Sequence, residues 1–308
     1  MAKSRKKAYF YLIIIVLIWS AAASVVKLTL RGFDPFVFLT YRFLISAAIA
    51  VPILVLTKIQ WSRVRKYLPA IILYSLLATT FSLGALFIGL DRSTVLDLNL
   101  LATLGPLLIA FGGAKLFHDK ITHREKVGIS IAVCGTLFAL FVPLLISQAS
   151  FRLTGNIFLV IHLITDVSAI LLVKRLVRKN LSAISISSIA FIVGALTTGA
   201  ITFYVYGWDF VINQIITAAP RYHAGVFYMA LLSGTVAYYL LIQAEKSLEV
   251  SEAGLFGYLN PVFATIIAVT WLGESITLPF IIGAVIIGFG VFHAEYKHPR
   301  NRHLKKLH

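Results

Sequence analysis

The chain has 308 residues, of which 59% are hydrophobic and only 13% charged, and its mean hydropathy is +0.90. A soluble domain has roughly a quarter of its residues charged, so this composition excludes an ordinary soluble protein and predicts a polytopic membrane protein. The net charge of +16 would suggest nucleic-acid binding in a soluble protein. In a membrane protein, basic residues gather in cytoplasmic loops, and we expect no nucleic-acid partner.

Apolar segments long enough to cross a membrane follow one another along the whole chain. A transmembrane helix needs ~20 mainly apolar residues. We therefore expect an all-α integral membrane protein with ten transmembrane helices, at residues 9–30, 36–57, 69–90, 95–117, 127–146, 154–173, 183–206, 224–244, 252–272 and 280–294. The connection 207–223 alone is long enough for an extra helix at the outer interface.

The basic residues alternate between the two sides of this predicted arrangement. With the N-terminus inside, 21 of the 28 Lys and Arg residues fall on inner segments and 4 on outer loops. This asymmetry predicts that both termini lie in the cytoplasm.

Two stretches of the chain repeat each other at one constant offset. Duplicated halves in a membrane protein are typical of secondary transporters, and the period is far longer than that of a solenoid. The predicted topology puts Asp119 inside and its counterpart outside, so the repeat is inverted. We expect a first five-helix half at 1–148, a second inverted half at 149–296 and a basic cytoplasmic tail at 297–308 that meets lipid head groups. The matched pairs are Pro106 and Pro261, Asp119 and Glu274, Thr122 and Thr277, Gly128 and Gly283, and Gly135 and Gly290.

Proline and glycine mark special positions in these helices. Pro106 and Pro261 each remove a backbone hydrogen bond in mid-helix, which predicts a bend at the mouth of a site or a static kink that aids packing. Small residues let helix backbones approach closely. We expect this at Gly128, Gly135, Gly283, Gly288 and Gly290.

Ionisable residues inside the membrane are candidate functional residues, because burying them is unfavourable unless they are paired or hydrated. Asp166 lies near the middle of its helix, with His162 one turn earlier on the same face. The pair could pass a proton, since histidine titrates near neutral pH, or hold a substrate ammonium. Alternatively, Asp166 neutralises Arg42 or Lys27 between helices.

Four further polar residues are candidates for substrate contact or a structural role. Arg42 either braces its helix or binds substrate, and Lys27 either snorkels outward or contacts substrate. Asp97, followed by Asn99, is either a substrate contact or an acid favoured by the helix dipole.

The motifs resemble the drug/metabolite transporter superfamily, and specifically its EamA-type ten-helix exporters. The resemblance covers nearly the whole chain and rests on Ile18-Trp19-Ser20 with Lys27, on Asp34-Pro35, on Tyr41-Arg42-Phe43-Leu44, and on the paired prolines, acidic-x-Ile-Thr turns and glycines. It implies alternating access around a central cavity, with the fifth and tenth helices peripheral. It also implies that Trp19, Tyr238, Tyr258 and Asn260 lie beside the cavity. Asp97 departs from the small residues expected at its position.

The leading hypothesis is a secondary transporter that exports a small amphipathic metabolite, most simply an amino acid. Buried charges of both signs with aromatics suit a zwitterion, and proton coupling and facilitated diffusion both remain open. The alternative substrate is a nucleotide- or lipid-linked sugar. We expect no enzyme and no cofactor or metal, because zinc, nucleophile-elbow and P-loop motifs are absent; a membrane transferase and a channel or scaffold are the rivals. We expect a monomer or homodimer in the cytoplasmic membrane of a prokaryote.

Overall fold

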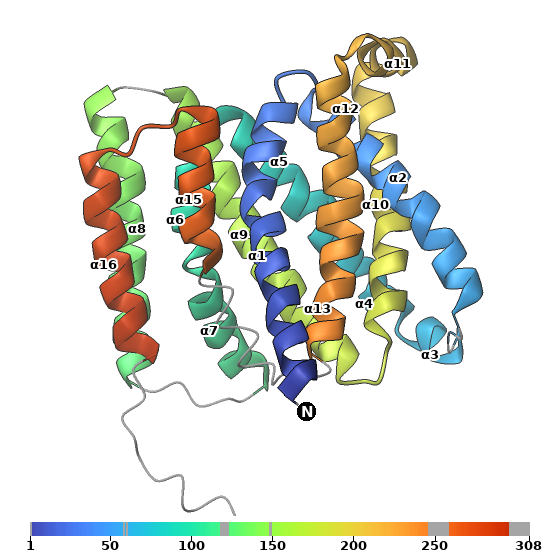
Figure 1. Ribbon diagram of the computed structural model, residues 1–308, viewed down its shortest axis with the longest axis horizontal. Helices are drawn as coiled ribbons and strands as arrows, with labels where there is room; N and C mark the ends of the chain where they lie inside the picture. The colour runs from blue at the N-terminus through green and yellow to red at the C-terminus, as the bar shows by residue number, and fades with distance from the viewer. Residues whose placement is uncertain are drawn as a thin grey trace, which may run out of the picture.

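The computed structural model describes residues 2–57, 59, 61–117, 123–147, 150–245 and 259–295, and within them the secondary structure is entirely helical. Figure 1 shows a bundle of long helices that run between two ends. We name the end that holds the chain's N-terminus the near end and the opposite one the far end. Within these described ranges, six helical stretches are long and apolar enough to cross a membrane, and three shorter apolar helices run through 126–142, 259–272 and 278–294.

The first half begins with two long helices, and two later helical segments are interrupted. Asp34 caps the second helix, accepting a hydrogen bond from the Phe36 amide at 3.1 Å, and Pro35 starts it with a ring already set for helical φ. The helices are α1 (Ala2–Thr29), α2 (Pro35–Leu56), α3 (Trp61–Lys66), α4 (Leu68–Ser75), the π-helix η1 (Leu76–Ser82), α5 (Leu83–Arg92), α6 (Val95–Ala102), α7 (Gly105–Phe117) and α8 (His123–Ser147). The π-helix η1 separates α4 from α5, and a short turn separates α6 from α7.

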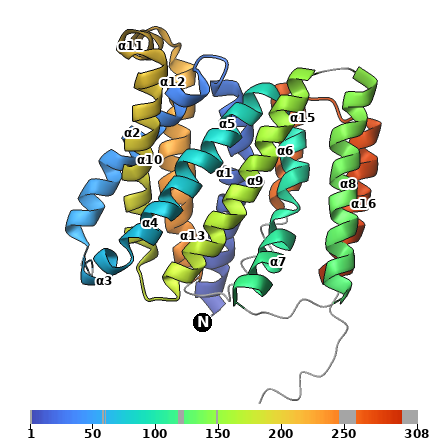
Figure 2. The same ribbon diagram turned by 180° about the vertical axis from the view of Figure 1, so that it is seen from behind.

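The second half has the same kind of interruption in its third helix. The connection 207–223 does hold an extra helix, α11, which lies across the far end in Figures 1 and 2. The short helix α3 was not expected. The second half comprises α9 (Ser150–Val177), α10 (Ala183–Tyr206), α11 (Trp208–Thr217), α12 (Pro220–Phe227), the π-helix η2 (Tyr228–Val236), α13 (Ala237–Glu245), α15 (Leu259–Leu272) and α16 (Leu278–Glu295).

Helices α8 and α16 stand side by side at one edge of the bundle (Figures 1 and 2). Their backbones approach so closely that a Cβ on Gly128 would lie 2.5 Å from the Gly290 carbonyl oxygen, and one on Gly283 would lie 2.4 Å from the Ala139 Cβ. The prediction for Gly288 is wrong, because a Cβ there would meet nothing within 4 Å. Gly288 therefore lies on another face of α16.

The link between α15 and α16 turns on a glycine at the far end. Gly273 has φ +68°, a left-handed conformation that glycine adopts without steric penalty. This turn ends α15 and directs the next residue, Glu274, toward the start of α6. The backbone thereby brings a carboxylate of the second half to a helix terminus of the first half.

Candidate functional site

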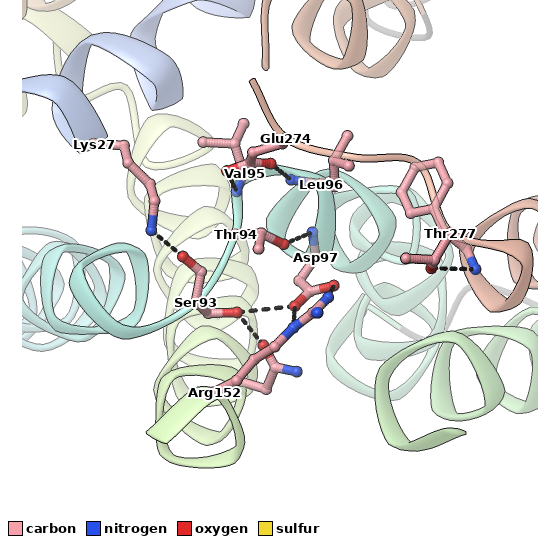
Figure 3. Close-up of polar contacts among 11 residues, drawn as sticks. Lys27, Ser93, Thr94, Val95, Leu96, Asp97, Arg152, Glu274 and Thr277 are labelled. Atoms are coloured by element: carbon pink, nitrogen blue, oxygen red, sulfur yellow. Dashed lines mark hydrogen bonds and ion pairs between the residues drawn. The ribbon is translucent and has the colours of Figure 1, made fainter. Parts of the chain in front are cut away.

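The N-terminus of α6 is capped by two side chains at the far end of the bundle. Thr94 Oγ1 accepts a hydrogen bond from the Asp97 amide at 3.0 Å. Glu274 accepts from the amides of Val95 (2.8 Å) and Leu96 (3.0 Å), one at each carboxylate oxygen (Figure 3). The first three amides of a helix have no partner inside it, and its positive end favours a carboxylate. Glu274, a residue of the second half, therefore caps α6, a helix of the first half.

A buried ion pair joins the two halves beside this cap. Arg152, in the first turn of α9, donates from Nε and Nη2 to the two carboxylate oxygens of Asp97, each at 2.9 Å. The Asp97 side chain is only 2% exposed. Ser93 Oγ lies 2.9 Å from Asp97 Oδ2 and also contacts Asn156 Oδ1. The fork of two parallel bonds is the strong geometry for an arginine–carboxylate pair.

Lys27 completes the group from α1. Its Nζ donates to the carbonyl oxygen of Leu90 at 2.7 Å. It also donates to the carbonyl oxygen of Ser93, at the end of α5 (Figure 3). Carbonyls at a helix C-terminus lack helical partners, and a cation there is stabilised by the helix dipole. The far-end cluster is defined here as Lys27, Ser93, Asp97, Arg152, Asn156 and Glu274.

Glu274 is the acid of this cluster that lies in a connection between helices. Burial raises the pKa of its carboxyl above the ordinary value. The amides of Val95 and Leu96 and the charge of Lys27 oppose that rise, because they stabilise the carboxylate. The pKa of Glu274 is therefore set by burial against these stabilising contacts.

The predicted pair His162 and Asp166 lies on α9 and meets the end of η1. His162 Nδ1 lies 2.9 Å from Ser82 Oγ and 3.0 Å from the Ser82 carbonyl oxygen. Because a carbonyl only accepts, this contact requires the proton on Nδ1 and leaves Nε2 of the neutral ring as the acceptor. Asp166 interacts with the His162 ring and with the Ser82 hydroxyl. The three side chains form the central triad.

Three other predicted residues are buried or bonded elsewhere in the bundle. Arg42 is buried, with its guanidinium carbon 5.2 Å from the Phe43 ring centroid. Asn99 is buried on α6, and within the described part of the chain its Nδ2 has no hydrogen-bond partner. Trp19 Nε1 donates to the Ser233 carbonyl of η2 at 3.2 Å.

The two prolines that were expected to bend their helices, Pro106 and Pro261, both lie near the start of a helix. α6 ends at Ala102 and α7 begins at Gly105, so the helix is interrupted directly before Pro106. Pro261 lies in the first turn of α15, and Ser20 Oγ donates to the neighbouring Asn260 at 3.2 Å. Tyr258 lies outside the described residues, and Tyr238 lies on α13.

The structure thus separates the predicted residues into two places. Lys27 and Asp97 meet in the far-end cluster, whereas His162 and Asp166 meet Ser82. No sequence motif marks Ser82, Ser93, Arg152 or Asn156 as functional, and Glu274 stands out in the sequence only as a position matched in the repeat. Among the described residues, no three His, Cys, Asp or Glu side chains gather as a metal site requires.

Comparisons with known proteins agree on one family. The EamA-like transporter family matches this chain twice, at residues 6–141 and 153–294. An uncharacterized transporter of Bacillus subtilis, YdfC, is 23% identical and covers 89% of this chain and 86% of its own length. An uncharacterized transporter of Archaeoglobus fulgidus is also 23% identical, over 93% of this chain and 98% of its own.

A solved structure shares the fold. One crystal structure superimposes with a TM-score of 0.63 at 17% identity, covering 96% of this chain and 100% of that one. The relatives span nearly their full length here, so the likeness concerns the whole membrane bundle. The two family matches, which cover most of the sequence, show that this chain is a member of the EamA-like transporter family.

Proposed function

We propose that this membrane transporter is a secondary exporter of a small zwitterionic metabolite, an amino acid with an apolar side chain, and works by alternating access between inverted halves in a prokaryotic cytoplasmic membrane. The far-end cluster is the outer gate. The central triad receives the substrate ammonium or the coupling proton.

One observation carries this proposal: the halves are joined at the far end by polar contacts rather than by apolar packing alone. Glu274 bonds to the start of α6, Arg152 pairs with Asp97, and Asn156 contacts Ser93. Each contact links residues of 1–148 with residues of 149–296. Polar contacts between charged groups can be exchanged for water when the halves part, so they suit a surface that opens and closes.

Two structural correspondences support the repeat on which alternating access depends. Shifted by the spacing between Pro106 and Pro261, η1 falls on residues 231–237, which overlap η2 (Tyr228–Val236). π segments within α-helices are rare and frequently mark functional sites. The matched glycines Gly128 and Gly283 also face the same interface between α8 and α16.

The central triad supports a zwitterion over a phosphorylated substrate. An ionised Asp166 offers a carboxylate to an ammonium, and Nε2 of the neutral His162 ring can take up a proton. Lys27, which a phosphate would need, instead donates to the Leu90 and Ser93 carbonyls. A nucleotide- or lipid-linked sugar therefore finds less support than an amino acid.

The test is efflux of a panel of labelled amino acids from proteoliposomes, with and without an imposed pH gradient. We expect saturable efflux of apolar amino acids that an inward proton gradient accelerates. Saturable efflux that ignores the gradient would leave export in place and remove proton coupling. Efflux of none of the panel would contradict the proposal.

The inverted topology has its own test, which uses thiol labelling in a Cys134→Ser background. Arg124→Cys at the start of α8 and Ser275→Cys before α16 both change exposed residues. We expect a membrane-impermeant reagent to label Ser275→Cys from outside and Arg124→Cys only from the cytoplasmic side. Labelling of both from one side would contradict the inverted repeat.

A further inference from the structure

A groove of about 380 Å³ opens at the near end, away from the far-end cluster and the central triad. It lies between α3 and the turn that joins α9 to α10, and Figure 1 shows these elements together at that end. Four apolar and four polar residues line it. The apolar residues are Ile59, Val64, Val177 and Leu181, and the polar residues are Arg63, Asn180, Ser182 and Ser185. A groove with such a wall fits an amphipathic ligand.

Helix α3 has the composition of a helix that lies at a membrane surface. Trp61 is 52% exposed and Val64 is buried, while Arg63, Arg65 and Lys66 are exposed. Tryptophan and basic residues concentrate at the level of the lipid head groups. The groove beneath α3 therefore lies at the depth where a lipid phosphate is found.

The polar side of the groove presents hydrogen-bond donors that are only partly used within the described residues. Arg63 Nη1 donates to the Asn180 carbonyl at 3.2 Å, which uses one of the five N–H donors of a guanidinium. Ser182, at the N-cap of α10, makes no capping hydrogen bond with its side chain. The first amides of α10 are thus left without a side-chain acceptor, and a helix N-terminus in this condition attracts anions.

A buried hydroxyl completes this set of donors. Ser185, in the first turn of α10, is only 4% exposed and lines the groove. Within the described residues its side chain makes no hydrogen bond. Because Ser185 lines the groove, its hydroxyl is available to a ligand oxygen there.

The charge around the groove has one sign. Segments 58–68 and 174–190 contain eight basic residues and no Asp or Glu. Basic pockets beside transmembrane helices bind anionic lipid head groups. We propose that this groove binds the phosphate of an anionic phospholipid, with Arg63, Ser185 and the first amides of α10 holding the phosphate oxygens and Val64, Val177 and Leu181 contacting the glycerol and acyl chain.

The experiment measures binding of phosphatidylglycerol to the purified full-length protein by native mass spectrometry, with phosphatidylcholine of the same chains as the reference. We expect Arg63→Gln to weaken phosphatidylglycerol binding about tenfold, since it removes a charge-assisted hydrogen bond. Arg65→Gln removes the same charge from the same helix but does not line the groove, and should change binding less than about twofold. Equal losses in both variants would overturn the site, since they would indicate non-specific attraction.

A second pair of variants leaves the Arg63–Asn180 contact intact and so separates binding from folding. Ser185→Ala should weaken phosphatidylglycerol binding several-fold, whereas Ser187→Ala, two residues along and outside the groove wall, should not. No effect of Ser185→Ala in a protein with normal thermal unfolding would contradict the proposed phosphate contact.

Two competitors identify the source of the phosphate. Inorganic phosphate and glycerol phosphate should displace the lipid only at far higher concentration than phosphatidylglycerol itself, because they lack the acyl chain that contacts the apolar wall. Displacement by either at the same concentration as the lipid would overturn the assignment to a lipid, in favour of a water-soluble phosphate.

Discussion

The far-end cluster and the central triad both place ionisable side chains in an apolar bundle, but they satisfy them differently. In the far-end cluster Asp97 is bonded through both carboxylate oxygens and Glu274 through both of its own. In the central triad His162 is held through one ring nitrogen by Ser82. Both acids of the cluster are fully paired, although within the described residues the buried Nδ2 of Asn156 has no hydrogen-bond partner, whereas Ser82 contacts the His162 ring at Nδ1.

The origin of the contacts also differs. The far-end cluster draws its members from both halves, so any motion that separates the halves there must break it. The triad lies between α9 and the end of η1, and its two ionisable members share one helix. Acids that are paired across the halves suit a gate, and two ionisable groups on one helix suit a binding or proton-accepting site.

The largest expected effect comes from removing one partner of the ion pair. Asp97→Asn leaves Arg152 without its carboxylate, and losing one member of a buried pair destabilises a protein by about 3 kcal/mol or more. The Arg152 side chain is 27% exposed, so water can partly solvate it when its partner is lost. We therefore expect a loss of free energy of unfolding of about 3 kcal/mol rather than more. Thermal unfolding in detergent measures it.

A double variant distinguishes loss of the pair from loss of either side chain. Asp97→Asn with Arg152→Gln should cost less than the sum of the two single changes, because neither charge is then left unpaired. Additive losses would mean that the two residues do not stabilise each other.

The central triad should respond in the opposite way. Asp166→Asn removes a charge that is not part of a complete network, so unfolding should change little. Transport should fall about tenfold or more, equivalent to about 1.4 kcal/mol, and its dependence on the pH gradient should disappear. Ser168→Ala on the same helix is the control and should transport normally, because within the described part of the chain the Ser168 hydroxyl bonds only to the Ile164 carbonyl. Unchanged transport across pH in Asp166→Asn would remove this residue from the mechanism.

The smallest effect is expected at Glu274, and it depends on pH. Because burial raises the pKa of Glu274, the folded protein binds its proton more readily than the unfolded chain does. The contribution of Glu274 to the free energy of unfolding is therefore fully present below the pKa that it has in the unfolded chain. This contribution is lost as the pH rises through the higher pKa of the folded protein. Glu274→Gln should abolish this slope and weaken the helix cap by about 1 kcal/mol.

Unfolding as a function of pH tests this, with Ser275→Ala at the neighbouring exposed position as the reference. Parallel pH profiles for the wild type and Glu274→Gln would show that the pKa of Glu274 is the same in the folded and unfolded states, which would contradict the prediction. A wild-type slope of opposite sign would show that the amides and Lys27 outweigh burial.

Much of the fold follows from the sequence because membrane spans depend on local composition. The apolar runs located the long helices to within a few residues, and the glycine rule located the close contact of α8 with α16. The rule failed at Gly288, because spacing alone did not identify the face of α16 that meets α8. The π segments were not predicted, since an extra residue in a helical turn leaves no mark on hydropathy.

The candidate site was predictable only in part for a similar reason. Lys27, Asp97, His162 and Asp166 stood out because charge is unfavourable in a membrane. Their partners did not stand out. Ser93 and Arg152 read as residues of short connections, and the Ser82 carbonyl became a partner of His162 only through the packing of η1 against α9. Pairing of distant segments determines these contacts, and no local pattern encodes it.

The central claim is that the far-end cluster is the outer gate, and the labelling rate of a cysteine behind it tests this most directly. Asn99 is buried on α6, one turn below the capped terminus, so Asn99→Cys in a Cys134→Ser background reports access from the far end. The reagent is membrane-impermeant, and labelling is measured below the unfolding temperature, with exposed Ser275→Cys as the reference. We predict slow labelling with the cluster intact and markedly faster labelling when Asp97→Asn is added, while the reference is unchanged. Equal labelling of Asn99→Cys with and without Asp97→Asn would contradict the account.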